Sequence, residues 1–150
     1  TTSPGAIALH NHVFVREDLY RPDFARIYPQ GTDLYDLMLF AHEMTHAWQW
    51  QNRDRTGYSP WKAAGEHQAD TDPYLFDLGV TPDFLSYPYE QQAAIVEEFV
   101  CCRALAPKAA RTKRLHGMLA PVMPVQLLQS HIDALAVVPW SGAETAGICD

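Results

Sequence analysis

The segment Asp33 to Asn52 decides the fold of this chain, and it reads DLYDLMLFAHEMTHAWQWQN. It contains neither Gly nor Pro, and Thr32 or Asp33 can cap a helix at its start. At ~1.5 Å per residue this helix is about 30 Å long, so we expect it to cross the whole domain. Apolar and small side chains recur at three- and four-residue steps, which predicts a wide buried stripe: Leu34, Leu37, Met38, Ala41, Met44, Thr45 and Trp48.

The flanking segments predict a small sheet and a second long helix. Residues 6–15, AIALHNHVFV, favour one long strand or two short strands that turn at His10-Asn11. Residues 89–105 contain no Gly or Pro and predict a helix that Pro107 ends.

The rest of the chain carries weaker patterns. Gly and Pro interrupt residues 53–88, which therefore read as mostly loop. Short helices are expected at 61–68 and 83–86, one helical turn at 115–118, a third helix at 124–136 and a loose tail over the last ten residues. The order of these elements predicts an α+β fold with little sheet, in one domain that covers residues 1–150.

The composition excludes several classes of protein. Hydrophobic residues make up 47% of the chain and charged residues 19%, so it is neither disordered nor fibrous. The formal net charge of −7 argues against a nucleic-acid partner, and no apolar stretch reaches the ~18–20 residues that a membrane-spanning helix needs. Five of the basic residues lie between Arg103 and Arg114; we expect a solvated face there, with a docking surface for an acidic protein partner as the alternative.

Three cysteines are too few for a disulfide framework. Cys101 and Cys102 are neighbours, and Cys149 lies near the end of the chain. We predict three reduced thiols, which favours a reducing compartment such as the cytoplasm. The alternative is one bridge from Cys149 to a member of the pair.

The centre of the long helix, His42-Glu43-Met44-Thr45-His46, has the pattern HExxH. Residues i and i+4 of a helix share one face, so both imidazoles can reach one metal ion, and zinc accepts such nitrogens at ~2.0–2.1 Å. Glu43 then lies beside the metal, where it can take a proton from a water bound there. The alternative is a structural role for both histidines with a surface glutamate between them.

A zinc site of this kind needs a third protein ligand and leaves the fourth position for water. Glu90 is the preferred candidate because it opens the second helix, where Ala93 and Ala94 at i+3 and i+4 let two helices approach closely. Glu97, two turns beyond Glu90 on the same face, is either a reserve ligand or the acceptor of a hydrogen bond from a ligand histidine. A polar loop supplies the other candidates, His67, Asp70 and Asp72.

Residues 41–51, AHEMTHAWQWQ, and residues 89–99, YEQQAAIVEEF, together resemble the zincin metallopeptidases of the glutamate-ligand branch, the gluzincins. The chain is most similar to small bacterial zincin-like domains with HE-hydrophobe-THxWQ followed by Y-x-x-EQQA-x-I, some of which occur beside Rhs or Vgr-type secretion proteins. The resemblance covers roughly residues 7–99 and implies one zinc ion held by His42, His46 and Glu90, with Glu43 as general base.

The resemblance also implies an edge strand within residues 7–15, above the active helix, that holds a substrate peptide in extended form by β-addition. Related sequences tend to have Gly-Asn in the turn of this segment, where this chain has His10-Asn11. His10 and His12 are expected to flank the cleft, with a second metal site as the alternative.

These features predict a zinc-dependent metallopeptidase that acts on a peptide or protein. The oxyanion of the tetrahedral intermediate would need one more hydrogen-bond donor besides zinc. A tyrosine hydroxyl can serve, and Tyr87 is the first choice, ahead of Tyr89 and Tyr74. The alternative is a non-catalytic, zinc-stabilised scaffold that binds a peptide or a partner protein. Glu43 favours the enzyme, because a scaffold has no use for a base beside its metal ligands. A secreted effector domain would apply the same chemistry in another compartment.

Overall fold

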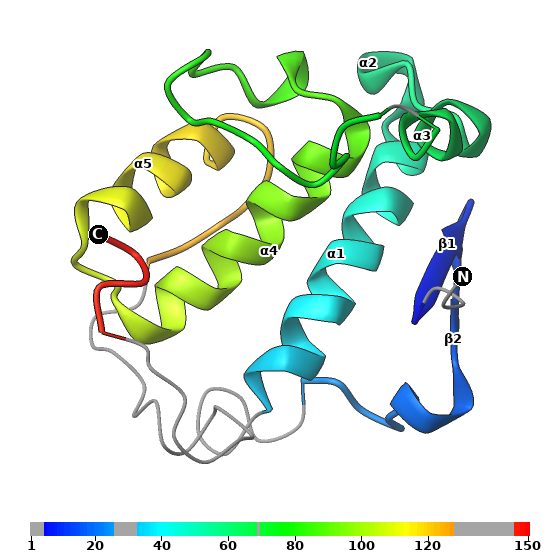
Figure 1. Ribbon diagram of the computed structural model, residues 1–150, viewed down its shortest axis with the longest axis horizontal. Coiled ribbons are helices and arrows are strands. Elements are labelled where there is room, and N and C mark those ends of the chain that lie inside the picture. Colours follow the sequence, from blue (N-terminus) through cyan, green and yellow to red (C-terminus); the bar gives the residue numbers. More distant parts are fainter. Residues whose placement is uncertain (1–4, 26–32, 69, 128–145) are drawn as a thin grey trace.

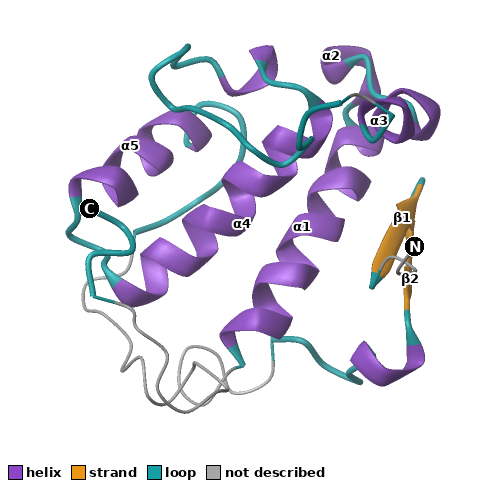
Figure 2. Cartoon of the chain, viewed as in Figure 1, coloured by secondary structure: helices purple, strands orange, loops and turns teal. Residues whose placement is uncertain are grey.

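The computed structural model describes residues 5–25, 33–68, 70–127 and 146–150. The N-terminal hairpin, helix α1, helix α4 and helix α5 follow one another across the molecule (Figure 1). Helices dominate the described residues, and the sheet found among them is a two-stranded hairpin (Figure 2), so the predicted α+β class with little sheet is confirmed. In chain order the elements are β1 (Ala6–Leu9), β2 (His12–Val15), η1 (Glu17–Leu19), α1 (Leu34–Gln51), α2 (Arg53–Thr56), α3 (Pro60–Glu66), η2 (Phe84–Ser86), α4 (Tyr89–Leu105) and α5 (Ala110–Leu119).

Of the two arrangements expected for residues 6–15, the structure shows two short strands that turn at His10-Asn11 and not one long strand. The strands pair antiparallel, with Leu9 opposite His12 and Ala6 opposite Val15. His10 has a φ of 57°, in the left-handed region that favours glycine, at a cost of roughly 1–2 kcal/mol. Its ring lies 4.1 Å from that of Trp50 on α1, and this contact holds the turn against the helix.

Helix α1 runs as predicted, but its buried surface is wider and more polar than expected. Asp33 caps it by accepting a hydrogen bond from the backbone N–H of Asp36. Met44, placed in the buried stripe by its spacing, is 42% exposed. The residues buried near the middle of the helix are largely polar: His42, Glu43, Thr45, His46, Ala47 and Gln49. The predicted stripe is thus confirmed in part: Leu34 and Thr45 are buried and Trp48 packs on the core, but Met44 is exposed. Polar residues share the buried surface because α1 turns its polar side toward α4 and β1.

Helix α4 has the predicted bounds and runs antiparallel to α1, so that its first residues lie beside the end of α1 (Figure 1). Helix α3 begins at Pro60 and ends at Glu66, close to the expected 61–68, and η2 covers most of the expected 83–86. Helix α2 was not predicted. None of the described helices is both long and apolar enough to cross a membrane.

The C-terminal part of the chain differs most from the prediction. Helix α5 is ten residues long, where a single turn at 115–118 was expected, because Leu115, Met118 and Leu119 pack together against α4. Residues 124–127 are not helical, so the third helix predicted at 124–136 does not start there, and residues 128–136 lie outside the described part of the chain.

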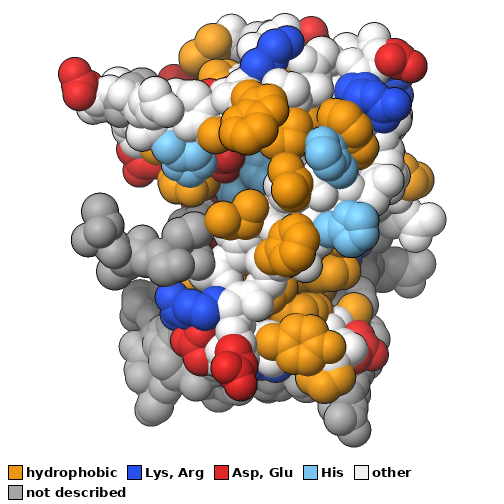
Figure 3. Space-filling model, turned by 90° about the vertical axis from the view of Figure 1, so that its right-hand side faces the viewer, with side chains coloured by type: hydrophobic (Ala, Val, Ile, Leu, Met, Phe, Trp, Pro, Cys, Tyr) orange, Lys and Arg blue, Asp and Glu red, His pale blue; other side chains and the backbone are white. Residues whose placement is uncertain are grey.

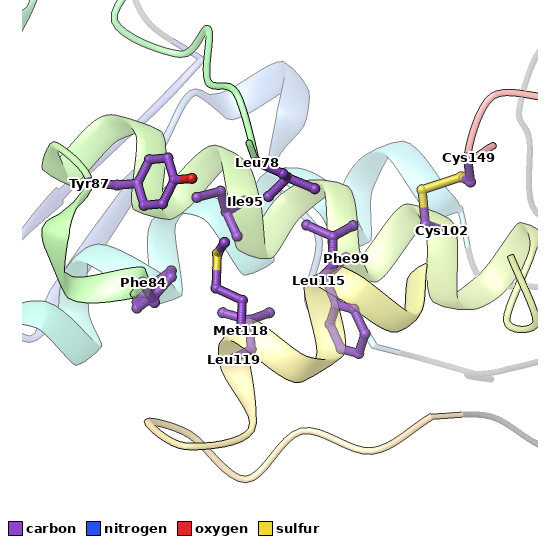
Figure 4. Close-up of a cluster of buried hydrophobic side chains, with 10 residues drawn as sticks. All are labelled: Leu78, Phe84, Tyr87, Ile95, Phe99, Cys102, Leu115, Met118, Leu119 and Cys149. Carbon is purple, nitrogen blue, oxygen red and sulfur yellow. A yellow bond between two sulfur atoms is a disulfide. The ribbon is translucent and has the colours of Figure 1, made fainter. Parts of the chain in front are cut away.

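The main hydrophobic core lies between α4, α5 and the loop that precedes α4, on the side of α4 away from the hairpin (Figure 4). Its members are Leu78, Phe84, Tyr87, Ile95, Phe99, Cys102, Leu115, Met118, Leu119 and Cys149. Trp48 packs on this cluster from α1, with its ring 6.1 Å from that of Phe84. Most of the apolar burial is therefore separate from the polar contact between α1 and α4.

A disulfide joins Cys102 of α4 to Cys149 in the C-terminal segment, and Cys101 is free and buried. The prediction of three reduced thiols is wrong, and the alternative bridge from Cys149 is the one present. Cys102 faces the core, and the tail returns to it, which brings the two Cα atoms to 5.6 Å, within the range that a disulfide spans.

We expect the substitution Cys149→Ser to lower the free energy of unfolding by about 2–4 kcal/mol, because the bridge closes a segment of 47 residues in the unfolded chain. Urea unfolding of the wild type with and without dithiothreitol measures this. Reductant should lower the stability of the wild type to that of the variant and leave the variant unchanged. An oxidised wild type no more stable than Cys149→Ser contradicts the bridge.

Candidate metal centre

Three side chains from α1 and α4 converge at one buried point. His42 Nε2 and His46 Nε2 each lie 3.3 Å from Glu90 Oε2. All three residues are buried, at 8%, 6% and 5% exposure, and their ligand atoms lie within 4.8 Å of one another. The triad predicted from the sequence is therefore assembled, and it is positioned to bind a metal ion.

The chemistry of the donor set fits a metal cation. Two imidazole nitrogens and one carboxylate oxygen are typical ligands of divalent transition metals. Glu43, next to His42 in the chain, has a buried Oε2 with no hydrogen-bond partner among the described residues. Burial raises the pKa of Glu43, although His42 and His46 nearby and a hydrogen bond from the backbone of Ala8 lower it. A buried carboxylate oxygen without a hydrogen bond is costly, so Oε2 of Glu43 is a candidate functional atom beside the triad.

Glu97 fixes the orientation of His42. The Nδ1 of His42 lies 3.0 Å from Glu97 Oε2, so its N–H donates to that carboxylate and Nε2 is left for a metal. Burial lowers the pKa of His42, but the hydrogen bonds with Glu90 and Glu97 raise it more, to about 9. Of the two roles predicted for Glu97, the structure places it as the acceptor rather than as a ligand.

Two buried glutamines orient His46 and join α1 to α4. Gln49 Oε1 accepts a hydrogen bond from His46 Nδ1 at 2.8 Å, which leaves Nε2 of His46 for a metal. The amide nitrogen of Gln49 donates to Gln92 Oε1 and to the carbonyl of Tyr89, both at 3.0 Å. Gln92 in turn donates to the carbonyl of Tyr87 at 2.7 Å. The glutamines of the two sequence motifs thus form one network, a role that the sequence analysis missed.

Glu66, at the end of α3, anchors the helix that carries Glu90. Its two carboxylate oxygens accept hydrogen bonds from the backbone N–H groups of Tyr89 and Glu90, at 2.9 and 2.8 Å. Pro88, the residue before α4, offers no side-chain cap, so a carboxylate from another helix takes that place and suits the positive end of the dipole. No local pattern in the sequence marks Glu66 for this role.

The polar loop proposed as an alternative source of ligands contributes one neighbour of the triad. His67 Nε2 lies 3.1 Å from Glu90 Oε1, the oxygen that does not face His42 and His46. Asp72 accepts a hydrogen bond from the backbone of Tyr74 instead, and Asp70 is exposed. Hydrogen bonds with His42 and His46 lower the pKa of Glu90 against the opposing effect of burial, so this ligand stays ionised.

Tyr87 is not at the metal centre. Its hydroxyl donates to the carbonyls of Asp77 and Thr81, at 2.8 and 3.0 Å, and its ring belongs to the hydrophobic core. The prediction that Tyr87 donates to an oxyanion at the metal centre is therefore wrong, because the chain turns its side chain to the far side of α4. Tyr89 donates to the carbonyl of Thr56.

Two other tyrosines lie beside the triad. The ring of Tyr74, the third tyrosine considered, is 5.6 Å from His42 and 5.5 Å from His67. Burial and nearby carboxylates raise the pKa of Tyr74 to about 12, so its hydroxyl keeps its proton. Tyr58, which the sequence analysis missed, stacks on His46 with the ring centres 6.0 Å apart.

The triad forms the floor of a cleft of about 580 Å³ whose walls are β1 and α3. Figure 3 shows the face on which histidine and apolar side chains gather around this cleft. The carbonyl of Gly5 accepts a hydrogen bond from the backbone N–H of Arg16, so Gly5 and Arg16 form a hydrogen-bonded pair. In an antiparallel ladder such pairs alternate with pairs that share no hydrogen bond, and Ala6 and Ala8 belong to the latter kind. The backbone groups of Ala6 and Ala8 therefore point away from β2, and Ala8 meets Glu43.

The other candidate residues have structural contacts. His10 packs on Trp50 and His12 on Phe14, with ring centres 4.1 and 6.4 Å apart, so neither lies in a metal cluster of the described residues. Glu98 accepts hydrogen bonds from the guanidinium of Arg111 and takes no part in the triad.

No protein-family model, curated protein or solved structure matches this chain.

We expect Glu90→Ala to abolish tight metal binding, and Glu97→Ala to weaken it about 10- to 100-fold by releasing the His42 ring. Calorimetric titration with Zn²⁺ measures both affinities. Glu98→Ala is the matched control, because Glu98 lies on the same helix but pairs with Arg111, and its affinity should equal that of the wild type. A Glu97→Ala variant that loses the metal while Glu90→Ala keeps it reverses the two roles.

Gln49→Leu should lower the free energy of unfolding by about 1–3 kcal/mol, because the buried partners of the glutamine lose their hydrogen bonds. Metal affinity should also fall, since the His46 ring is no longer oriented. Thermal unfolding and metal titration report the two effects. Gln51→Leu, at an exposed position two residues further on, should change stability by no more than about 0.5 kcal/mol. Equal effects of the two substitutions argue against the network.

Proposed function

We propose that this chain is a zinc metallopeptidase of the gluzincin type, in which His42, His46 and Glu90 hold the ion and Glu43 is the general base. The observation that carries the proposal is the buried His-His-Glu triad with an unpaired glutamate oxygen beside it. The resemblance of the two motifs to zincins supports the same assignment.

The distances within the triad favour zinc. Two ligand atoms that each lie ~2.0–2.1 Å from a tetrahedral ion are about 3.3–3.4 Å apart. Both histidine nitrogens lie 3.3 Å from Glu90 Oε2. Nitrogen ligands further favour zinc over calcium and magnesium, which take oxygen.

Glu43 performs the proton transfers in this proposal. Zinc in the triad supplies Lewis acidity and makes water acidic enough to act as a nucleophile near neutral pH. Glu43 accepts the proton of the attacking water and delivers it to the departing amine. Burial raises the pKa of Glu43, which makes its carboxylate a better proton acceptor than a solvated glutamate. Tyr74, whose hydroxyl stays protonated, is the nearest candidate to donate to the oxyanion.

The outer edge of β1 is suited to hold the substrate. Ala6 and Ala8 present backbone groups to the cleft, directly beside Glu43. An extended peptide can add to this edge as a third strand, and main-chain hydrogen bonds would place its scissile bond over the triad. The bond cleaved would thus be a peptide bond in an unfolded segment, since only an extended chain can pair with the edge.

The substitution Glu43→Gln tests the proposal. The side chain keeps its shape but cannot accept a proton at neutral pH, so peptide cleavage should fall about 10²- to 10⁴-fold while zinc content and fold persist. The measurement is digestion of a broad peptide library by both proteins, with zinc determined on each. The double variant His42→Ala, His46→Ala is the control and should lose zinc and activity together.

Two outcomes contradict the proposal. Equal cleavage by the wild type and Glu43→Gln removes Glu43 from the reaction. No cleavage by a zinc-loaded wild type, together with tight peptide binding by both proteins, identifies a zinc-stabilised scaffold instead of an enzyme.

A further inference from the structure

We propose that the walls of the cleft select a substrate with a bulky apolar side chain beside the scissile bond, and that Trp61 of α3 is the main residue that determines this preference. The inference rests on the proposed function, because it assigns the substrate class of the same site. It comes from the parts of the cleft that hold no metal ligand.

Large apolar side chains line the mouth of the cleft on both sides. Trp61 is 84% exposed on the α3 wall, and Ile7 and Leu9 of β1 are 51% and 41% exposed on the opposite wall. An indole left this open to water is unusual in a folded domain, where Trp is buried on average. Such side chains gathered at a cleft rather than scattered over the surface indicate a binding site.

Small residues also line this cleft. They are Ala63 and Ala64 of α3 and Ala6 and Ala8 of β1. Small side chains leave more room for a ligand than large ones do. A side chain of a bound peptide that points toward α3 would therefore meet the indole of Trp61, the ring of Pro60 and the methyl groups of Ala63 and Ala64.

The apolar part of the cleft offers no partner for a charged substrate side chain. Among the described residues that line it, none is Lys, Arg or Asp. Its carboxylates are those of Glu43 and Glu90, at the reaction centre. A charged substrate side chain that entered the apolar part would lose its water without gaining a partner, which is unfavourable. A large apolar side chain gains by the same transfer.

The size of the expected preference follows from the size of the side chain. Exchanging one apolar side chain for one that is smaller by a methylene changes kcat/KM by about 10- to 200-fold in a fitted pocket. The mouth of this cleft is open to water, so we expect about 10- to 100-fold between Leu or Phe and Ala at the selected position, and a similar factor against Lys or Asp.

The experiment uses zinc-loaded protein and a set of peptides that differ only at the residue on either side of the cleaved bond. Wild type should cleave the Leu and Phe peptides with a kcat/KM about 10- to 100-fold above that of the Ala, Lys and Asp peptides. Trp61→Ala and Ala64→Phe should each reduce this ratio at least fivefold, mainly through KM, the first by removing the wall and the second by filling the space. Val80→Ala is the matched control, since Val80 is 74% exposed and lies outside the cleft.

A binding measurement separates the inference from the function on which it rests. Fluorescence anisotropy with the same peptides on Glu43→Gln should show the same order of affinity, and Trp61→Ala in that background should remove it. Cleavage with no preference among the peptides, or a preference that Trp61→Ala and Ala64→Phe leave intact, overturns this inference and leaves the peptidase standing. Neither cleavage nor binding of any peptide overturns both.

Discussion

The polar contact between α1 and α4 is the interaction on which the rest of the structure depends. Long helices usually meet through apolar side chains, and Leu34 of α1 clusters in this way with Cys101 and Ala104 of α4. Elsewhere along the same interface, however, Gln49 and Gln92, at 0% and 1% exposure, face each other. A buried amide is tolerated only when its hydrogen bonds are made, so the two helices can pack in one register alone. That register brings Glu90 opposite His42 and His46. The geometry of the metal centre is thus a consequence of helix packing.

Local sequence patterns were sufficient for the elements that carry the centre. Both long helices lack Gly and Pro and begin at recognisable boundaries, Asp33 and Pro88, so their bounds could be predicted. The spacing of His42 and His46 places both on one helical face whatever the rest of the chain does. The hairpin was also predictable, since its turn follows from local sequence. These are short-range properties, in which neighbouring residues decide the outcome.

Features that depend on distant partners could not be predicted in this way. The sequence does not show that the tail returns to pair Cys149 with Cys102, or that Glu66 caps a helix that begins more than twenty residues later. Tyr87 is close to Glu90 in sequence, but one turn of chain is enough to direct it to the opposite side of α4. The apolar stripe predicted for α1 included Met44, which is exposed, because a helix pattern reveals amphipathicity and not which face a neighbour covers.

The walls and the floor of the cleft come from different parts of the chain. His42, His46 and Glu90 belong to the paired long helices, whereas β1 and α3 supply the walls, with the backbone of Ala8 at Glu43 and the cap at Glu66 as their links to the triad. Exposed side chains of the walls can therefore change during evolution without moving the triad. If the proposed function holds, natural variants of this domain can diverge in substrate while they share one reaction, and the exposed face of α3 is a practical starting point for directed evolution.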